Sequence, residues 1–182
     1  MKREWEMIWT RTWNIGCHVT ELEEAGDFRV HPFGKESLLF VRGADDVVRG
    51  FFNVCQHRGN ILCQVREGMV DHFKCPFHGW EWNLDGSLKQ VMHPQLFPQF
   101  KDGIPDGDLD LPVLKVELWG GWVWFNMDTE AGPLREFLGE AGAQLETYEH
   151  EKYNLVDYKS FEWQGNWKHA HDAFNESYHF EA

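Results

Sequence analysis

The sequence has few cysteines, few basic side chains and no long apolar run. Four cysteines among 182 residues are too sparse for a secreted scaffold held together by disulfides. Its 17 basic residues stand against 30 acidic ones, and the net charge of −13 argues against nucleic acid or an anionic membrane as a partner. No stretch approaches the roughly 18 apolar residues of a membrane span. Because Glu4 and Glu6 also stand where a secretory signal needs apolar residues, we expect a soluble, cytoplasmic protein.

Aromatic side chains, by contrast, are plentiful. Ten tryptophans and 14 phenylalanines contribute to an aromatic fraction of 15% and a hydrophobic fraction of 42%. Such a chain can bury a substantial core, so disorder is not expected. Its length fits one large domain, or one domain and part of another.

The middle of the chain, from about residue 28 to residue 126, has the pattern of an all-β region. Short apolar segments alternate there with turns that contain glycine and aspartate. Asp85-Gly86 is a strong hairpin signal, and Gly120-Gly121 separates two apolar segments in the same way. Strands are expected at 37–41, 47–54, 73–75, 80–84, 87–88, 113–119 and 122–126. Residues 91–112 are rich in proline, glycine and aspartate and are expected to form a long loop.

Helical periodicity flanks this region on both sides. Apolar residues recur every three to four positions within 3–13 and again within 133–147, which predicts two amphipathic helices. A strand is expected at 153–163. Asn166 is a good helix N-cap, and a third helix is expected to run from there toward the end. The apolar positions are Trp5, Ile8, Trp9 and Trp13 in the first helix, and Leu134, Phe137, Leu138, Ala141 and Leu145 in the second.

Two short segments of the β region carry the chemistry. Each places a cysteine and a histidine close together in a loop: Cys55 with His57, and Cys75 with His78. Four such ligands suit a [2Fe–2S] cluster of the Rieske type, in which two thiolates bind one iron and two neutral imidazoles bind the other. A glycine lies within two residues of each histidine and lets the backbone turn tightly beside the cluster.

A zinc site is the alternative for these four residues. Tetrahedral zinc accepts two cysteines and two histidines, but its usual spacing pairs cysteine with cysteine and histidine with histidine. Here each segment mixes the two residue types, which favours the cluster. The other two cysteines, Cys17 and Cys63, are expected to be packed, reduced thiols.

These motifs resemble a known family. C-x-H-R-G, followed after residue 59 by a spacer and then C-P-F-H-G-W, is similar to the cluster motif of Rieske proteins, and more narrowly to the α subunit of Rieske non-haem iron ring-hydroxylating oxygenases. The resemblance implies an α+β fold. It implies an N-terminal helix, 1–13, that packs on the catalytic domain, an all-β Rieske domain, 14–128, and the beginning of a truncated, helix-grip-like α+β catalytic domain, 129–182.

A second constellation lies near the end of the chain. His169, Asp172, Glu176 and His179 share about a quarter of a helical circumference. Alone, this pattern is typical of the polar face of an amphipathic helix. By resemblance, His179 is the first histidine of an H-x₄-H pair that binds a mononuclear Fe(II), and Glu176 bridges that site to a Rieske histidine of a neighbouring subunit. The second histidine would follow Ala182, so we expect the chain to be part of a longer protein.

The implied function is that of a terminal oxygenase. The [2Fe–2S] centre would receive electrons from a ferredoxin or a flavin reductase and pass them to Fe(II), which activates O₂ to hydroxylate a small apolar substrate, above all an aromatic hydrocarbon. The implied assembly is a homotrimer or an α₃β₃ complex with a small β subunit. The alternative is a Rieske ferredoxin-like electron carrier without an oxygenase site, although such a carrier would not need residues 129–182.

Overall fold

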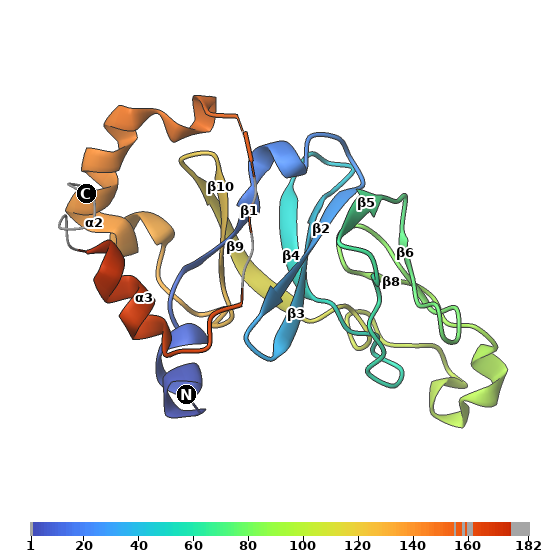
Figure 1. The fold of residues 1–182 in the computed structure, drawn as a ribbon. Coiled ribbons are helices and arrows are strands. Elements are labelled where there is room, and N and C mark those ends of the chain that lie inside the picture. The colour runs from blue at the N-terminus through green and yellow to red at the C-terminus, as the bar shows by residue number, and fades with distance from the viewer. Residues whose placement is uncertain (1, 155, 158, 160–161, 176–182) are drawn as a thin grey trace.

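The computed structural model describes residues 2–154, 156–157, 159 and 162–175. It is a mostly β structure with a few helices (Figure 1). Seven strands form an antiparallel sheet in the order β1-β10-β9-β4-β3-β2-β5, and three short strands form a second sheet in the order β6-β7-β8. The first sheet contains β1 (Asn14–His18), β2 (Asp27–Phe33), β3 (Glu36–Arg42), β4 (Val48–Phe52), β5 (Glu67–Met69), β9 (Val113–Trp119) and β10 (Trp122–Asn126); the second contains β6 (Phe73–Lys74), β7 (Glu81–Trp82) and β8 (Leu88–Gln90).

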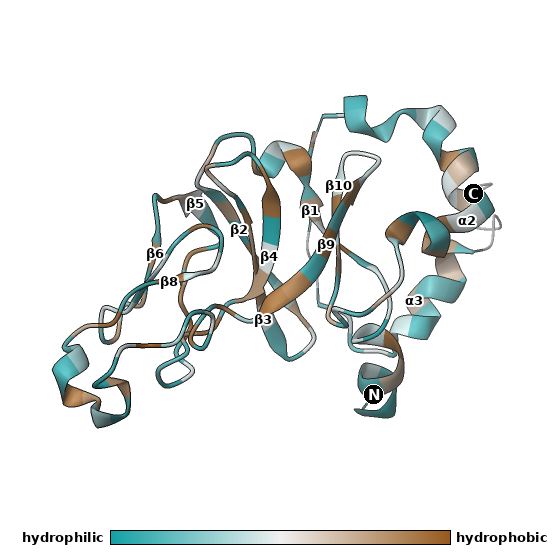
Figure 2. Cartoon of the chain, turned by 180° about the vertical axis from the view of Figure 1, so that it is seen from behind, coloured by the Kyte–Doolittle hydropathy of each residue, from teal (hydrophilic) through white to brown (hydrophobic). Residues whose placement is uncertain are grey.

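The helices gather at one end of the large sheet. A short α1 (Lys2–Glu4) continues as one π-helical stretch (Trp5–Trp9), α2 spans Leu134–Leu145 and α3 spans Trp167–Phe174. Figures 1 and 2 show α2, α3 and the N-terminal helix beside β1 and β10, while the small sheet and the loop of residues 91–112 lie at the opposite end, beyond β5. No helix in the described part of the chain is both long and apolar enough to cross a membrane.

The strand β3 separates two cores because it is buried on both faces. Successive side chains of a strand point to opposite faces. Leu39 and Val41 therefore join one core, between the large and the small sheet, and Leu38 and Phe40 join the other, toward the helices. All four side chains are inaccessible to solvent. Figure 2 shows apolar residues concentrated in the strands, whereas α3 is largely hydrophilic.

Several of the expected elements are confirmed. The last hairpin has the expected bounds, 113–119 and 122–126, and positive φ angles of 61° and 80° at Gly120 and Gly121 suit its tight turn. Residues 91–112 form a loop with two short 3₁₀ turns, Pro94–Leu96 and Pro98–Phe100. Asn166 caps α3, as its side chain accepts a hydrogen bond from the backbone N–H of Lys168 at 3.1 Å.

Three expectations need correction. The first helix ends near Trp9, because the side chain of Asn14 donates hydrogen bonds to the carbonyls of Trp9 and Thr12 and so ends the helix. The second helix is confirmed as α2, but Leu134 is the only one of its expected apolar residues that is buried, and non-helical backbone angles at Gly139 interrupt it. No described residue within 153–163 belongs to a strand, and Val156 is 96% exposed there.

Candidate iron–sulfur centre

The two cysteine-histidine loops are built alike. In the first, the N–H of Cys55 donates to the carbonyl of Asn60 at 2.8 Å, and the N–H of Gly59 donates back to the carbonyl of Cys55 at 2.9 Å. In the second, the same two bonds join Cys75 with Trp80 at 2.8 Å, and Gly79 with Cys75 at 3.0 Å. The φ angles of the two glycines are +70° and +72°, a left-handed conformation that glycine adopts without strain. Two loops of one design thus face each other.

Each loop is attached to the same core. The first loop follows β4 and is closed by an isolated bridge between Val54 and Ile61. The second is the turn of the β6–β7 hairpin, whose last pair joins Lys74 to Glu81. Cys55 and Cys75 belong to the core between the two sheets, where they are 3% and 2% exposed. The fold therefore fixes both cysteines from beneath.

The two thiols contact each other and receive backbone hydrogen bonds. A hydrogen bond joins the sulfur atoms of Cys55 and Cys75, and both cysteines are free of disulfides. Burial raises the pKa of Cys55, while for Cys75 the hydrogen-bond donors outweigh burial and lower the pKa. Hydrogen bonds from backbone amides stabilise the thiolate form of cysteine, and the thiolate is the form that binds metal. The donors are the N–H groups of His57 and Arg58 to Cys55, those of Phe77 and His78 to Cys75, and the side chain of Asn60, 3.9 Å from the sulfur of Cys75.

The two imidazoles also lie together, but in different surroundings. The ring centroids of His57 and His78 are 4.7 Å apart. His57 is half-buried, with the indole of Trp80 stacked on it at 4.8 Å and the ring of Phe97 edge-on at 5.7 Å. His78 is exposed, and its ring lies 3.9 Å from that of Phe77. The histidine side of the site thus faces outward, and the cysteine side faces the core.

These residues fit a two-iron cluster. The Nδ1 atom of His57 is shielded from solvent and has no hydrogen-bond partner, so its lone pair is available to a metal. In the described part of the chain, no three histidine, cysteine or acidic side chains converge on the position of one ion. A Rieske cluster requires two protein ligands on each iron, a pair of thiolates and a pair of imidazoles. The arrangement supplies these two pairs side by side.

The other two cysteines lie apart from the loops. Cys17 is buried in the core nearer the helices, and Cys63 is half-buried at the edge of the core beneath the loops. Burial raises the pKa of each thiol to about 12. Both are therefore protonated at neutral pH, in agreement with the expectation of packed thiols.

Of the four candidate residues near the end of the chain, two belong to α3 and two follow it. His169 and Asp172 are exposed on α3. Glu176 and His179 lie outside the described residues. The helix that leads to them is at the opposite end of the molecule from the cluster loops (Figures 1 and 2).

Comparison with known proteins identifies the family. The profile of the Rieske [2Fe-2S] domain matches residues 12–101. Over 98% of its length, the chain is 31% identical to the carnitine monooxygenase oxygenase subunit of Escherichia coli (strain K12), of which it covers 47%. The chain belongs to the Rieske non-haem iron oxygenase α subunits. It contains their Rieske domain and spans about half the length of the curated relatives it matches, on their N-terminal side.

Other members of this Rieske oxygenase family act on different compounds. The biphenyl 2,3-dioxygenase subunit alpha of Rhodococcus jostii (strain RHA1) is 33% identical over 77% of the chain and 30% of that protein. The structure of the quaternary ammonium Rieske monooxygenase CntA with L-carnitine superposes with a TM-score of 0.89 at 29% identity, over 98% of this chain and 50% of that one. Naphthalene 1,2-dioxygenase from Rhodococcus sp. gives a TM-score of 0.74 at 27% identity, over 81% and 33%.

The roles of three residues around the site were not foreseen from the sequence. Trp80 and Phe97 wall in His57, and Glu81 is a buried carboxylate directly after the second loop. The sequence offered one signal for Glu81, because it lies between two tryptophans in an expected strand. For Phe97, which belongs to a long loop, there was none.

Proposed function

We propose that Cys55, His57, Cys75 and His78 hold a [2Fe–2S] cluster, with the thiolates on one iron and the imidazoles on the other. The matching geometry of the two loops carries this proposal. A Rieske cluster accepts and releases one electron. The cysteine side is buried and receives backbone amides, which stabilise negative charge on sulfur. Trp80 and Phe97 exclude water from His57, while His78 is accessible to a redox partner.

The protein that contains this chain is, in our proposal, a terminal oxygenase component. It would take electrons from a ferredoxin or a flavin reductase, and a mononuclear Fe(II), with His179 among its ligands, would supply the O₂ activation that hydroxylates a small organic substrate. The observation that favours this over a Rieske ferredoxin-like carrier is that similarity to oxygenase subunits extends over 98% of the chain, well beyond the Rieske domain. A carrier has no use for α2 and α3.

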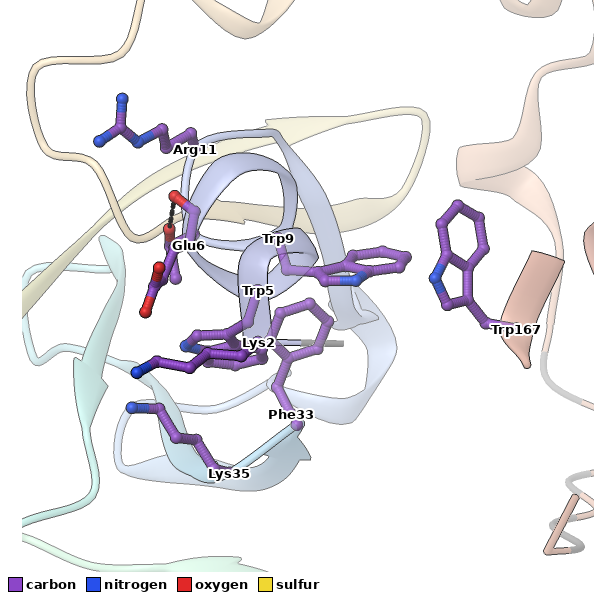
Figure 3. Close-up of a pocket in the computed structure, with 10 residues that line it drawn as sticks. Lys2, Trp5, Glu6, Trp9, Arg11, Phe33, Lys35 and Trp167 are labelled. Carbon is purple, nitrogen blue, oxygen red and sulfur yellow. Dashed lines mark hydrogen bonds between the residues drawn. The ribbon is translucent and has the colours of Figure 1, made fainter. Parts of the chain in front are cut away.

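Residues 129–182 then begin the catalytic domain, on which the N-terminal helix packs. Two contacts support this arrangement: the rings of Trp9 and Trp167 are 4.9 Å apart, and Lys168 pairs with Glu4. Figure 3 shows Trp9 between Trp5 and Phe33 on one side and Trp167 on the other. These four residues help to line a cleft of about 960 Å³. Helix α3 is thereby fixed against the N-terminal helix.

Glu176 and His179 complete the proposal. His179 would bind the mononuclear iron, with the remaining ligands supplied by residues after this chain, and Glu176 would bridge to the Rieske histidines of a neighbouring subunit. Since the cluster loops and α3 lie at opposite ends of the molecule, a contact between subunits is the direct way to bring a site beside α3 close to the loops of a neighbour. A head-to-tail contact can close into a ring, and the ring we propose is a homotrimer, or an α₃β₃ complex with a small β subunit.

For the substrate we propose a small apolar compound, above all an aromatic one. The relatives include enzymes named for biphenyl and for carnitine, so both kinds of compound belong in the test. Substrate-dependent O₂ uptake by the reduced α subunit, measured with each kind, distinguishes them. No uptake with any substrate, combined with a reversible cluster signal, would favour the electron carrier.

The cluster itself is tested on the purified chain. We expect a red-brown protein with two irons and two acid-labile sulfides per chain, and a rhombic electron paramagnetic resonance signal after reduction. One zinc ion per chain and no visible absorption would contradict the cluster and favour a zinc site.

A further inference from the structure

The carboxylate of Glu81 is buried next to the proposed cluster. Among the buried residues of the described chain, Glu81 alone carries an acidic side chain, at 9% exposure. It follows the second loop directly, three residues after His78, and it is the register partner of Lys74, the residue before Cys75. A buried charge is costly unless it is paired and hydrogen-bonded. Its position therefore requires a reason.

Basic side chains surround this carboxylate. The ammonium of Lys74 lies 2.9 Å from Oε1 of Glu81, and the ring nitrogen Nε2 of His72 and the ammonium of Lys89 lie 3.5 Å and 3.9 Å from Oε2. The hydrogen bond from Lys74, together with the charges of Lys74, His72 and Lys89, outweighs burial and lowers the pKa of Glu81. Glu81 is thus a permanent anion at neutral pH.

Lys74 links this ion pair to the loop itself. A Cβ atom built on Gly79 would lie 3.7 Å from Cε of Lys74 and 3.2 Å from Cγ of Met92, so both side chains pack over the backbone beside His78. The ammonium at the end of that stem is held by Glu81. The pair therefore closes the base of the loop and covers one side of it.

From this geometry we infer that Glu81 is a positioning residue of the cluster loop, and that the Glu81–Lys74 pair sets the reduction potential of the cluster. The inference rests on the proposed cluster. Reduction adds one negative charge to the centre. A nearby anion without a partner disfavours reduction, and a nearby cation without a partner favours it. In the ion pair, the charges of Glu81 and Lys74 offset each other.

The experiment measures the midpoint potential of the cluster in three variants of the holoprotein. Glu81→Gln leaves the lysine charges unbalanced, and we expect a higher potential than in the parent. Lys74→Met keeps the aliphatic stem but leaves the carboxylate unbalanced, and we expect a lower potential. The double variant removes both charges, and its potential should return toward that of the parent. Iron and sulfide contents are measured in every sample, so that only loaded protein is compared.

The matched control is the exposed ion pair between Lys152 and Glu149, which lies near α2 at the other end of the molecule. Lys152→Met and Glu149→Gln should leave the potential unchanged. A merely structural role for the Glu81–Lys74 pair would lower thermal stability without shifts of opposite sign, and that result would overturn the inference. If the parent protein carries no iron and sulfide, the proposed cluster fails instead, and the two failures are therefore distinguishable.

Discussion

The indole of Trp80 lies flat on the imidazole of His57, with the ring planes only 9° apart and the centroids separated by 4.8 Å. Trp80 is 3% exposed and belongs to the core that also contains both loop cysteines. A flat stack leaves the edge of the imidazole, with its nitrogens, free to bind while restricting rotation of the ring. The tryptophan of the second loop thus orients the histidine of the first.

The stack predicts that Trp80→Ala is costly in two ways. Removing a buried tryptophan should lower the free energy of unfolding by about 3–5 kcal/mol, measured by urea denaturation. Iron should also be lost to a chelator faster than from the parent, because His57 is no longer held. Trp80→Phe should retain most of the stack. Trp163→Ala serves as a control, since that tryptophan is 54% exposed and the change should cost little. Unaltered iron release from Trp80→Ala would contradict the orienting role.

The two left-handed glycines predict a graded effect of alanine. Gly59 has open space around it, so Gly59→Ala should cost only backbone strain, about 1–2 kcal/mol. Gly79→Ala should cost more, because the new methyl group also meets Met92 at 3.2 Å. Gly132→Ala is the control, with open space and no left-handed backbone. Equal unfolding free energies for all three variants would refute the assigned loop geometry.

The cysteines should separate into ligands and packed thiols. Cys55→Ser should abolish the visible absorption and loosen the core beneath the loops, since the free energy of metal binding is also folding free energy. Cys63→Ser should keep its colour and two irons per chain, with a loss of at most about 1–3 kcal/mol for a hydroxyl in this half-buried position. Iron content and urea denaturation check both. A colourless Cys63→Ser beside a coloured Cys55→Ser would reverse the assignment.

His31 lies in an aromatic environment in the core nearer the helices. Its ring is within about 6 Å of three phenylalanine rings, those of Phe33, Phe40 and Phe125. Burial, assisted by the charges of Arg29 and Arg66 and opposed by that of Glu21, lowers the pKa of His31 from its ordinary value of 6.5. The folded protein therefore keeps this histidine neutral where the unfolded chain would already protonate it.

The stability of the protein should consequently depend on this histidine in mildly acidic solution. Since the folded pKa is depressed, the unfolded state binds more protons, and stability falls as the pH drops below about 6.5 until the folded pKa is reached. Above that pH the group has no effect. His31→Leu should flatten the fall between pH 7.5 and 5.5, measured by urea denaturation, whereas His169→Gln on the exposed face of α3 should not. An unchanged pH profile in His31→Leu would disprove the assignment.

The inter-subunit role of Glu176 can be tested only in the complete α subunit. Glu176→Gln should leave both metals bound and the cluster reducible, but slow the oxidation of the reduced cluster by substrate and O₂ by about 10-fold or more, as losses of such supporting hydrogen bonds do. Single-turnover stopped flow measures this rate. Unchanged cluster oxidation would show that Glu176 belongs only to a solvated helix face.

The sequence predicted most strands, and it singled out the four residues that the two loops bring together, because both depend on local pattern. Cysteine-histidine spacing marks the loops, and alternation with a Gly-Gly turn marks β9 and β10. The first helix was extended too far because nothing in the periodicity reveals that Asn14 would bond the carbonyl of Trp9. The stack of Trp80 on His57, and the place of Phe97 beside them, depend on the meeting of distant segments. Such contacts leave no periodic trace.

Because β3 divides the interior into two cores, the two parts of the iron-free protein should differ in stability. Each core has its own set of side chains, and only one of them contains the loop cysteines. We expect hydrogen exchange in the iron-free protein to quicken around β6–β8 while β1, β9 and β10 remain protected. Loss of iron would then loosen the region around β6–β8 and leave the rest of the large sheet folded. Cluster insertion would therefore begin from a partly ordered protein.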